Sequence, residues 1–317
     1  MLGSPLTAVV ESCETVVEQS KHVFIKPEGV SSLSKQIDSK LLDELCDRKH
    51  IDTQLHFVDD EETTIQYLFV MDALNFCFWP DPNLEYEHLA MGLKRTMEKD
   101  KTALAARNLL EIDGKSVRDL LGWRKPLPNE NERARLLREV GHGLLSHFDG
   151  KALNLVRRAN KSASVLVDLV TMHFPGFRDH AVYKGMQVFL YKRAQIFVGD
   201  VWGTYGGQGV GEFNDISCLT MFADYRVPVV LKNLGVLGYS EELERKVESL
   251  VELPAGCEEE IEIRAASVVG VERIRTLLRE KHGRAPHSVQ LDWWLWEKGE
   301  AARDTDPPHH RTMTVFY

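Results

Sequence analysis

The chain has 317 residues, a formal net charge of −9 and a hydrophobic fraction of 43%, as is typical of a soluble globular protein with one large or two ordinary domains. The acidic balance argues against long nucleic acid as a partner, because proteins that bind it usually present a basic stripe that neutralises several phosphates. No stretch approaches the roughly 18 consecutive apolar residues of a membrane helix, so we expect no membrane contact.

The first elements of the chain are predicted to be helices. Ser4 and Pro5 suit a helix start, with serine as the cap and proline at the first helical position. Apolar residues then recur at helical spacing as far as Val17. After a break at residues 24–29, a second helix is predicted from about residue 32 to residue 48.

Residues 55–79 contain the first stretch in which polar side chains interrupt apolar sequence. Acidic residues at positions 59–62 suit a helix start, and Pro80 ends the element. In a helix, Phe69, Asp72, Phe76 and Trp79 would share one face, with Asn75 beside them. A carboxylate there is costly to bury without a partner. Asp72 is therefore either tied to a backbone amide or a basic side chain, or part of a ligand-binding face, and the sequence favours neither.

The region from residue 84 to residue 174 resembles an ordinary helical scaffold without internal repeats. Helices are predicted near residues 86–98, 102–110, 116–122 and 129–148, with Ser116 as the cap of the third, and one or two more over residues 151–174. Residues 188–202 are helical in pattern for most of their length. Lys192 and Arg193 interrupt that apolar run, and we expect Arg193 to point outward and Lys192 to face an anion in a cleft.

A glycine cluster, residues 203–211, precedes the stretch on which the functional argument depends. Its spacing differs from the dinucleotide fingerprint, so we interpret it as a tight, close-packed turn. Asp224 follows, directly before a predicted short helix that ends at Gly235. Local sequence favours a helix cap for Asp224. The functional alternative is a general base, or a carboxylate that stabilises a developing cation.

The last part of the chain is predicted to contain helices that start at Ser240 and at Cys257, followed by an aromatic stretch over residues 288–298. The final residues, 307–317, end in three apolar side chains, so we expect them to dock on the protein. The five cysteines are far apart and form no Cys-x-x-Cys pair, which indicates reduced thiols in the cytosol, with the nucleus as an alternative, and no structural zinc. No other ligand set accompanies the adjacent pair His309 and His310, so we expect no metal and no cofactor.

The isolated carboxylates, a cation and the aromatic residues together suit a planar base on a sugar phosphate. Aromatic rings stack on bases, a lysine can hold a phosphate, and an aspartate near the anomeric carbon can stabilise an oxocarbenium-like transition state. Five segments, in this order, are similar to those of the queuosine salvage protein family: residues 71–80 (MDALNFCFWP), 191–196 (YKRAQI), 219–228 (LTMFADYRVP), 260–265 (EIEIRA) and 309–312 (HHRT).

The resemblance spans nearly the whole chain and implies a queuosine 5′-phosphate N-glycosylase, a hydrolase that releases the base queuine for reuse in transfer RNA modification. It also implies a mainly α fold, similar to the helix-hairpin-helix DNA glycosylases. By motif, Asp224 is the expected catalytic carboxylate and Lys192 a phosphate contact. The expected base pocket comprises Asp72, Asn75, Phe76 and Trp79. Nearness in sequence adds His310 and Arg311 for the phosphate, and Trp202, Asp215 and Tyr225 for the base or ribose.

We expect residues 1–317 to form a single helical catalytic domain, or two helical lobes with the active-site cleft between them. The expected partner is a small nucleotide, and the expected state is a monomer. As a cap, Asp224 should have a depressed pKa and stay ionised. Two other functions remain open: a nucleotide-binding carrier without turnover, and a glycosylase that acts on bases within nucleic acid, which the acidic charge disfavours.

Overall fold

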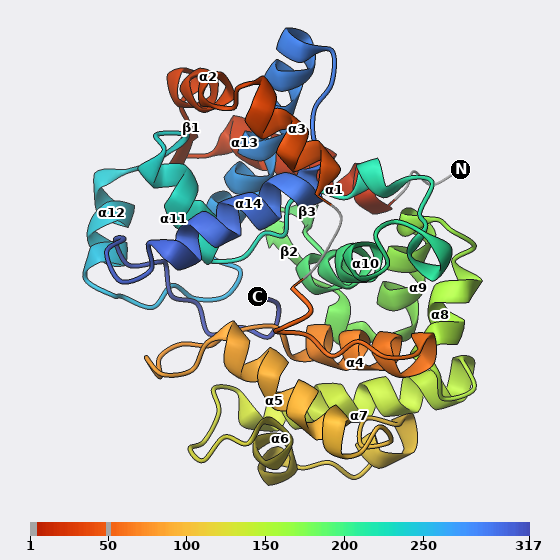
Figure 1. Cartoon of the computed structure of the whole chain (residues 1–317). Coiled ribbons are helices and arrows are strands. Elements are labelled where there is room, and N and C mark those ends of the chain that lie inside the picture. The colour runs from red at the N-terminus through yellow and green to blue at the C-terminus, as the bar shows by residue number, and fades with distance from the viewer. Residues whose placement is uncertain (1–4, 49–51) are drawn as a thin grey trace. The chain divides into compact units, whose positions relative to one another are not determined.

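The computed structural model describes residues 5–48 and 52–317 and is mainly helical (Figure 1). Its described residues form fourteen α-helices and two antiparallel sheets of two short strands each. The predicted mainly α fold is therefore confirmed, whereas the similarity to helix-hairpin-helix DNA glycosylases stays a prediction. The predicted cap Ser4 lies outside the described residues. Within these ranges, no helix is both long enough and apolar enough to cross a membrane.

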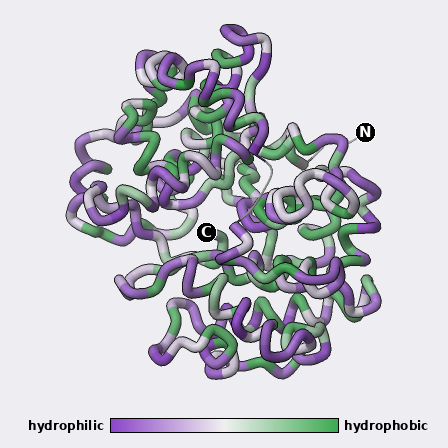
Figure 2. Tube along the Cα trace, viewed as in Figure 1, coloured by the Kyte–Doolittle hydropathy of each residue, from purple (hydrophilic) through white to green (hydrophobic). Residues whose placement is uncertain are grey.

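The chain divides into two compact units. The first comprises the described residues of Met1–Arg48, His180–Lys192 and Ile216–Met313, and the second comprises those of Lys49–Asp179, Arg193–Asp215 and Thr314–Tyr317. Each unit therefore combines segments that lie far apart in the sequence. In Figure 2, hydrophobic and hydrophilic residues alternate along most helices of both units, as expected of amphipathic helices that pack on a core.

The first unit is built around α13 (Glu258–His282), which contacts α1, α2, α11, α14 and β1. Because neighbours pack on several sides, α13 is buried without interruption from Glu260 to Val271. The other helices and strands of this unit are α1 (Pro5–Gln19), β1 (Val23–Ile25), α2 (Pro27–Gln36), α3 (Ser39–Asp47), β2 (His180–Tyr183), β3 (Met186–Phe189), α11 (Arg226–Asn233), β4 (Leu237–Tyr239), α12 (Glu241–Glu248) and α14 (Ser288–Ala301).

The second unit is built around α4 (Glu61–Leu74), whose residues from Thr64 onward are all buried. It packs against α5, α7 and α8. The other helices are α5 (Tyr86–Lys99), α6 (Gly114–Leu121), α7 (Glu130–His147), α8 (Ala152–Arg158), α9 (Ala163–His173) and α10 (Lys192–Thr204), whose first residue is the last of the first unit, with 3-10 turns at Ala106–Leu109, Pro175–Phe177 and Gly209–Gly211.

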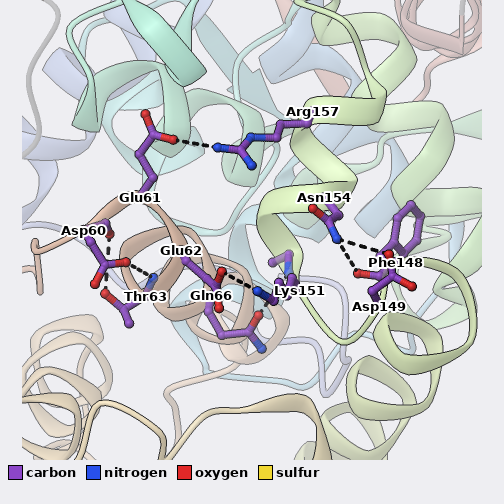
Figure 3. A network of polar contacts seen from close by, with 11 residues as sticks. Asp60, Glu61, Glu62, Thr63, Gln66, Phe148, Asp149, Lys151, Asn154 and Arg157 are labelled. Carbon is purple, nitrogen blue, oxygen red and sulfur yellow. Dashed lines mark hydrogen bonds and ion pairs between the residues drawn. The ribbon is translucent and has the colours of Figure 1, made fainter.

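Polar contacts fix the start of α4 against α8 (Figure 3). Glu62 pairs with Lys151 at 2.8 Å and Glu61 with Arg157 at 3.2 Å, across partly exposed side chains. Exposed pairs of this kind contribute about 0–1 kcal/mol each. The buried Gln66 is more constraining, because it donates to the carbonyl of Leu104 at 2.8 Å and accepts from the amide of Ala152 at 3.1 Å. These contacts hold α4, the helix that contains Asp72.

Several predicted boundaries are wrong. The helix predicted over residues 32–48 is two helices, because Asp38 interrupts it and accepts from the amide of Leu41 at 2.9 Å as the cap of α3. Asp113, not Ser116, caps α6. Only a 3-10 turn forms within residues 102–110, and residues 186–189 form a strand before α10. The helices predicted near residues 86–98 and 129–148 and from residues 240 and 257 are confirmed, whereas α14 was not predicted.

The C-terminal residues dock within the second unit, as predicted. Tyr317 is buried, and its carbonyl accepts from the amide of Cys77 at 2.9 Å. The carbonyl of Thr314 accepts from the side chain of Asn129 at 3.2 Å.

Candidate active site

Asp224 follows a buried segment of the first unit that has no regular structure. Residues 219–224 lie outside helices and strands, and all of them before Asp224 are buried. The carboxylate oxygen Oδ1 of Asp224 accepts from the amides of Arg226 at 3.0 Å and Val227 at 2.9 Å. These amides belong to the first turn of α11, which has no carbonyl partner for them. The side chain of Asp224 therefore caps the first turn of α11, as its local sequence indicates, although the N-cap position itself is Tyr225.

The pKa of Asp224 differs from our expectation. Burial of the carboxyl group raises its pKa above the ordinary value, although Lys192 and the two amide hydrogen bonds act in the opposite direction. The expected depressed pKa is therefore wrong, because desolvation disfavours the charged form more than the cap favours it. A carboxylate with a raised pKa binds a proton more readily than an ordinary aspartate, as is common in catalytic groups.

Lys192 and Arg193 are both buried, at 4% and 1% exposure. Lys192 belongs to the first unit and acts on the Asp224 carboxylate as a nearby positive charge. Arg193 belongs to the second unit, where it donates to the carbonyl of Ala73 at 2.6 Å and also to that of Gly176. The expectation that Arg193 points outward is wrong. Burial lowers its pKa to about 10, so it remains charged at neutral pH.

Tyr225 and His309 stack beside the Asp224 segment, with ring centroids 4.3 Å apart and an interplanar angle of 30°. Burial lowers the pKa of His309 to about 4, and its Nδ1 donates to the carbonyl of His310 at 2.6 Å. Burial also lowers the pKa of His310 well below the usual range, and the positive charge of Arg264 and of His309 in its protonated form acts in the same direction. Both imidazoles are therefore neutral at pH 7. Arg311 is partly exposed, and its carbonyl accepts from Leu253 at 2.7 Å.

In the second unit, Asp72 lies in a buried polar environment. Burial raises the pKa of Tyr67 and of Tyr86, and the negative charges of Asp72 and Asp200 raise both further. The positive charge of Arg193 also interacts with Asp72. The charged and phenolic groups near Asp72 therefore include Arg193, Tyr67 and Tyr86. These neighbours are compatible both with a structural role of Asp72 and with a role in ligand binding.

The predicted shared helical face of Asp72, Phe76 and Trp79 is wrong, because α4 ends at Leu74 and Asn75 forms its C-cap. Arg133 of α7 donates to the carbonyls of Leu74 at 2.7 Å, Phe76 at 2.6 Å and Cys77 at 2.7 Å. Arg193 donates in the same way to the carbonyl of Ala73. The two arginines therefore bind the backbone carbonyls that would accept from later amides if α4 continued.

Phe76 lies against the same guanidinium groups. The central carbon of Arg133 lies 4.2 Å from the centroid of its ring, and that of Arg193 lies 5.2 Å from it. Trp79 is partly exposed, whereas Asn75 and Phe76 are buried. Sequence reasoning missed Arg133, because a single arginine in an amphipathic helix normally faces solvent, and nothing in its neighbourhood signals otherwise.

Trp202 and Asp215 belong to other parts of the second unit. Trp202 is buried against the glycine cluster, as its neighbourhood in the sequence predicts. Asp215 caps α9: its carboxylate accepts from the amides of Ala163 at 2.6 Å and Ser164 at 3.2 Å, and from the hydroxyl of Ser162 at 2.7 Å. No ligand role of Asp215 follows from these contacts, and that role stays a prediction.

Replacing Gly207 with alanine is expected to destabilise the second unit and displace Trp202. Gly207 has a φ of +71°, and an added Cβ would lie 2.8 Å from Nε1 of Trp202. The expected cost is about 1–3 kcal/mol, visible in thermal melts and in tryptophan fluorescence. Gly209 is the matched control, since its φ is +57° but an added Cβ meets nothing within 4 Å. Equal losses for the two variants would contradict a role of the Trp202 contact.

In the first unit, His22, Glu258 and Glu262 bring three possible metal-ligand atoms within 4.8 Å of one another. However, the Glu262 carboxylate already accepts from the hydroxyls of Ser20 at 2.6 Å and Tyr183 at 2.7 Å, and from the amides of Lys21, His22 and Val23. We therefore interpret Glu262 as a structural anchor for residues 20–23. The expectation of no metal stays a prediction.

The sequence model of the queuosine salvage protein matches residues 55–317. The chain belongs to the queuosine salvage protein family. It is similar over its full length to curated members of this family that are each named queuosine 5′-phosphate N-glycosylase/hydrolase. The protein of Dictyostelium discoideum is 45% identical over 99% of this chain and 100% of its own length, and that of Sphaerobacter thermophilus is 39% identical over 98% and 97%. The protein of Mus musculus is 34% identical over 100% of both.

The predicted site residues of this queuosine salvage family member fall into two groups. The first unit contains Asp224 with its neighbours Lys192 and Tyr225, and also His310 and Arg311. The second unit contains Asp72, Asn75, Phe76, Trp79, Trp202 and Asp215.

Proposed function

We propose that this protein hydrolyses the N-glycosidic bond of queuosine 5′-phosphate and releases queuine for reuse in transfer RNA modification. One structural observation supports this most directly. The Asp224 carboxylate is oriented by two amides at 2.9–3.0 Å, is influenced by the buried cation Lys192, and has a raised pKa. Relatives that are up to 45% identical have the corresponding name.

In the proposed reaction, the bond between the anomeric carbon and the base breaks as positive charge develops on the ribose. Ionised Asp224 stabilises that charge and orients the water. The water adds its hydroxyl to the anomeric carbon and its proton is taken up by the departing base, so the products are queuine and ribose 5-phosphate. Position seven of the base is carbon and cannot be protonated as a purine nitrogen can. The negative charge on the leaving base must therefore be stabilised by hydrogen bonds donated to its edges, for which we propose the side-chain amide of Asn75. The Asp72 carboxylate is proposed to accept from the ring and amino hydrogens of the base.

The phosphate is proposed to bind Lys192, with His310 and Arg311 as further contacts. The neutral state of His310 limits it to a single uncharged hydrogen bond, so most of the attraction must come from the cations. We propose that the base or ribose is contacted by the aromatic residues Phe76, Trp79, Trp202 and Tyr225. Asp215 is proposed for the same role, although its carboxylate already accepts from two amides at the start of α9.

Lys192→Ala should weaken use of the phosphorylated substrate. A charge-assisted hydrogen bond is worth about 1.5–3 kcal/mol, so kcat/KM for the nucleotide should fall by about 10- to 100-fold, and less for the unphosphorylated nucleoside. Because Lys192 also lowers the pKa of Asp224, the acid limb of the rate profile should move to higher pH. Lys232→Ala, which breaks an ion pair with Glu244 in the same unit, is the control. Equal losses for nucleotide and nucleoside would argue against the phosphate contact.

Incubation with queuosine 5′-monophosphate tests the proposal as a whole. We expect free queuine and ribose 5-phosphate in equal amounts. Binding without product would make the protein a carrier, and preference for the modified base within transfer RNA would make it a nucleic-acid glycosylase. We also propose that the protein is a monomer, which light scattering tests. The proposed location is the cytosol, with the nucleus as an alternative.

A further inference from the structure

The backbone that precedes Asp224 is held by a side chain of α14. The amide of Phe222 donates to Oδ1 of Asp292 at 2.8 Å, and both groups are buried. Residues 219–224 lie outside helices and strands, so their backbone groups are not paired in a regular ladder. An amide buried without an acceptor costs about 1–3 kcal/mol, so the Asp292 carboxylate satisfies a group that the local structure does not.

A side chain of α13 holds the next part of the same segment. Nε of Arg264 donates to the carbonyl of Ala223 at 2.9 Å, and Nη1 of Arg264 lies 3.4 Å from Oε1 of Glu260. All three residues are buried. The ion pair with Glu260 keeps the guanidinium in one orientation, which a flexible side chain without a partner would not maintain.

The Ala223 carbonyl is part of the peptide group that also contains the nitrogen of Asp224. Because a peptide group is planar, fixing this carbonyl fixes the plane to which the Cα of Asp224 is attached. On the other side, the Asp224 carboxylate is fixed by the amides of Arg226 and Val227. Asp224 is thus constrained through its backbone by α13 and α14 and through its side chain by α11.

We infer that Arg264 and Asp292 are positioning residues for the catalytic carboxylate. This inference rests on the proposed function of Asp224. Both residues hold the main chain from which Asp224 projects, so that the second oxygen of its carboxylate keeps one place. A displacement of about 1 Å in a reacting group can reduce a rate by about a hundredfold, which sets the size of the expected effect.

Two variants of Arg264 separate position from charge. Arg264→Met removes the donor, and Arg264→Lys keeps the charge but loses the Nε position. Both should lower kcat for queuosine 5′-monophosphate by about 30- to 100-fold with KM changed less than about threefold. Restoration of kcat by lysine would overturn the positional role.

Arg275→Met is the matched control, since Arg275 lies on the same helix, donates through Nε to the carbonyl of Pro286 at 2.9 Å and pairs with Glu272 at 2.7 Å. It should lower the melting temperature as Arg264→Met does but keep kcat within about threefold of wild type. Equal losses of kcat in the two methionine variants would reduce Arg264 to a structural residue and contradict the inference.

Asp292 gives an independent test if the Arg264 variants do not fold. Asp292→Asn keeps an oxygen that can accept from Phe222 and should retain kcat within about fivefold, whereas Asp292→Leu removes the acceptor and should lose about 30-fold or more. Equal losses in both would overturn the role of the backbone contact. Lack of product with the wild-type protein would instead refute the proposed function, so the two failures are distinguishable.

Discussion

Asp224→Asn is expected to lower kcat by about a thousandfold or more and to leave the protein at least as stable to heat at pH 7 as the wild type. The asparagine oxygen can still accept from the amides of Arg226 and Val227, which lie 3.0 and 2.9 Å from Oδ1. The cap therefore survives, whereas the negative charge that should stabilise a cationic ribose does not. Nucleotide binding should be retained, and single-turnover kinetics with a binding titration measure both.

The expected gain in stability follows from the raised pKa of Asp224. A carboxyl whose pKa is higher in the folded than in the unfolded state stabilises the fold while it is protonated, below its unfolded pKa. That stability is lost as the pH rises through the folded value. At pH 7 the ionised carboxylate therefore costs stability that asparagine does not, and the advantage of Asp224→Asn should shrink as the pH falls. A melting temperature that is lower in the variant at pH 7 would contradict this.

The same pKa predicts the acid limb of the wild-type rate profile. Catalysis requires ionised Asp224, so kcat should fall with acid, with a midpoint above the ordinary aspartate value of about 4. A midpoint at or below that value would show that desolvation does not control this group.

Arg133→Ala is expected to be the most destabilising single change in the second unit. Arg133 donates to four carbonyls, those of Leu74, Phe76, Cys77 and Pro128, at 2.6–2.8 Å. An acceptor left unsatisfied in the interior costs about 1–3 kcal/mol, so we expect a total on the order of 4 kcal/mol and a melting temperature lower by about 10 °C. Because Asn75 and Phe76 lie in the released segment, KM for the nucleotide should rise as well.

Arg138→Ala is the control for this change. Arg138 lies on the same helix and donates to one carbonyl, that of Ile112, at 2.6 Å, in a partly buried contact. Its loss should cost about 1 kcal/mol and leave KM unchanged. If the two variants melt at the same temperature, the four-carbonyl contact of Arg133 does not stabilise the end of α4 as we infer.

The helical class and most of the helices could be predicted from apolar spacing and from caps, because these signals are local. Asp224 could be identified as a cap for the same reason, since its partners are two and three residues away. Its pKa could not be predicted, because burial depends on contacts that are distant in sequence. The end of α4 was missed for a similar reason: Arg133 and Arg193, far along the chain, bind the carbonyls that follow Asp72.

The positioning contacts of Asp224 show the same limit. The segment EIEIRA was recognisable as a family motif, but only the fold places Arg264 on the carbonyl of Ala223, 41 residues earlier in the chain. Asp292, in an aromatic stretch, gave no signal at all. Short-range patterns therefore identify local contacts, such as those of the Asp224 side chain with the start of α11, more readily than contacts that come from distant parts of the chain.

The Glu262 anchor bears on where this chain can be shortened. The family match begins at residue 55, which suggests a convenient starting point for recombinant expression. Yet four of the groups that donate to the buried Glu262 carboxylate come from residues 20–23. A chain starting at residue 55 would retain the Glu262 carboxylate near the start of α13 and lose most of its hydrogen-bond donors, as well as α1, α2 and α3. The limits of the family match are thus not the limits of an autonomously folding unit, and expression should keep the first 48 residues.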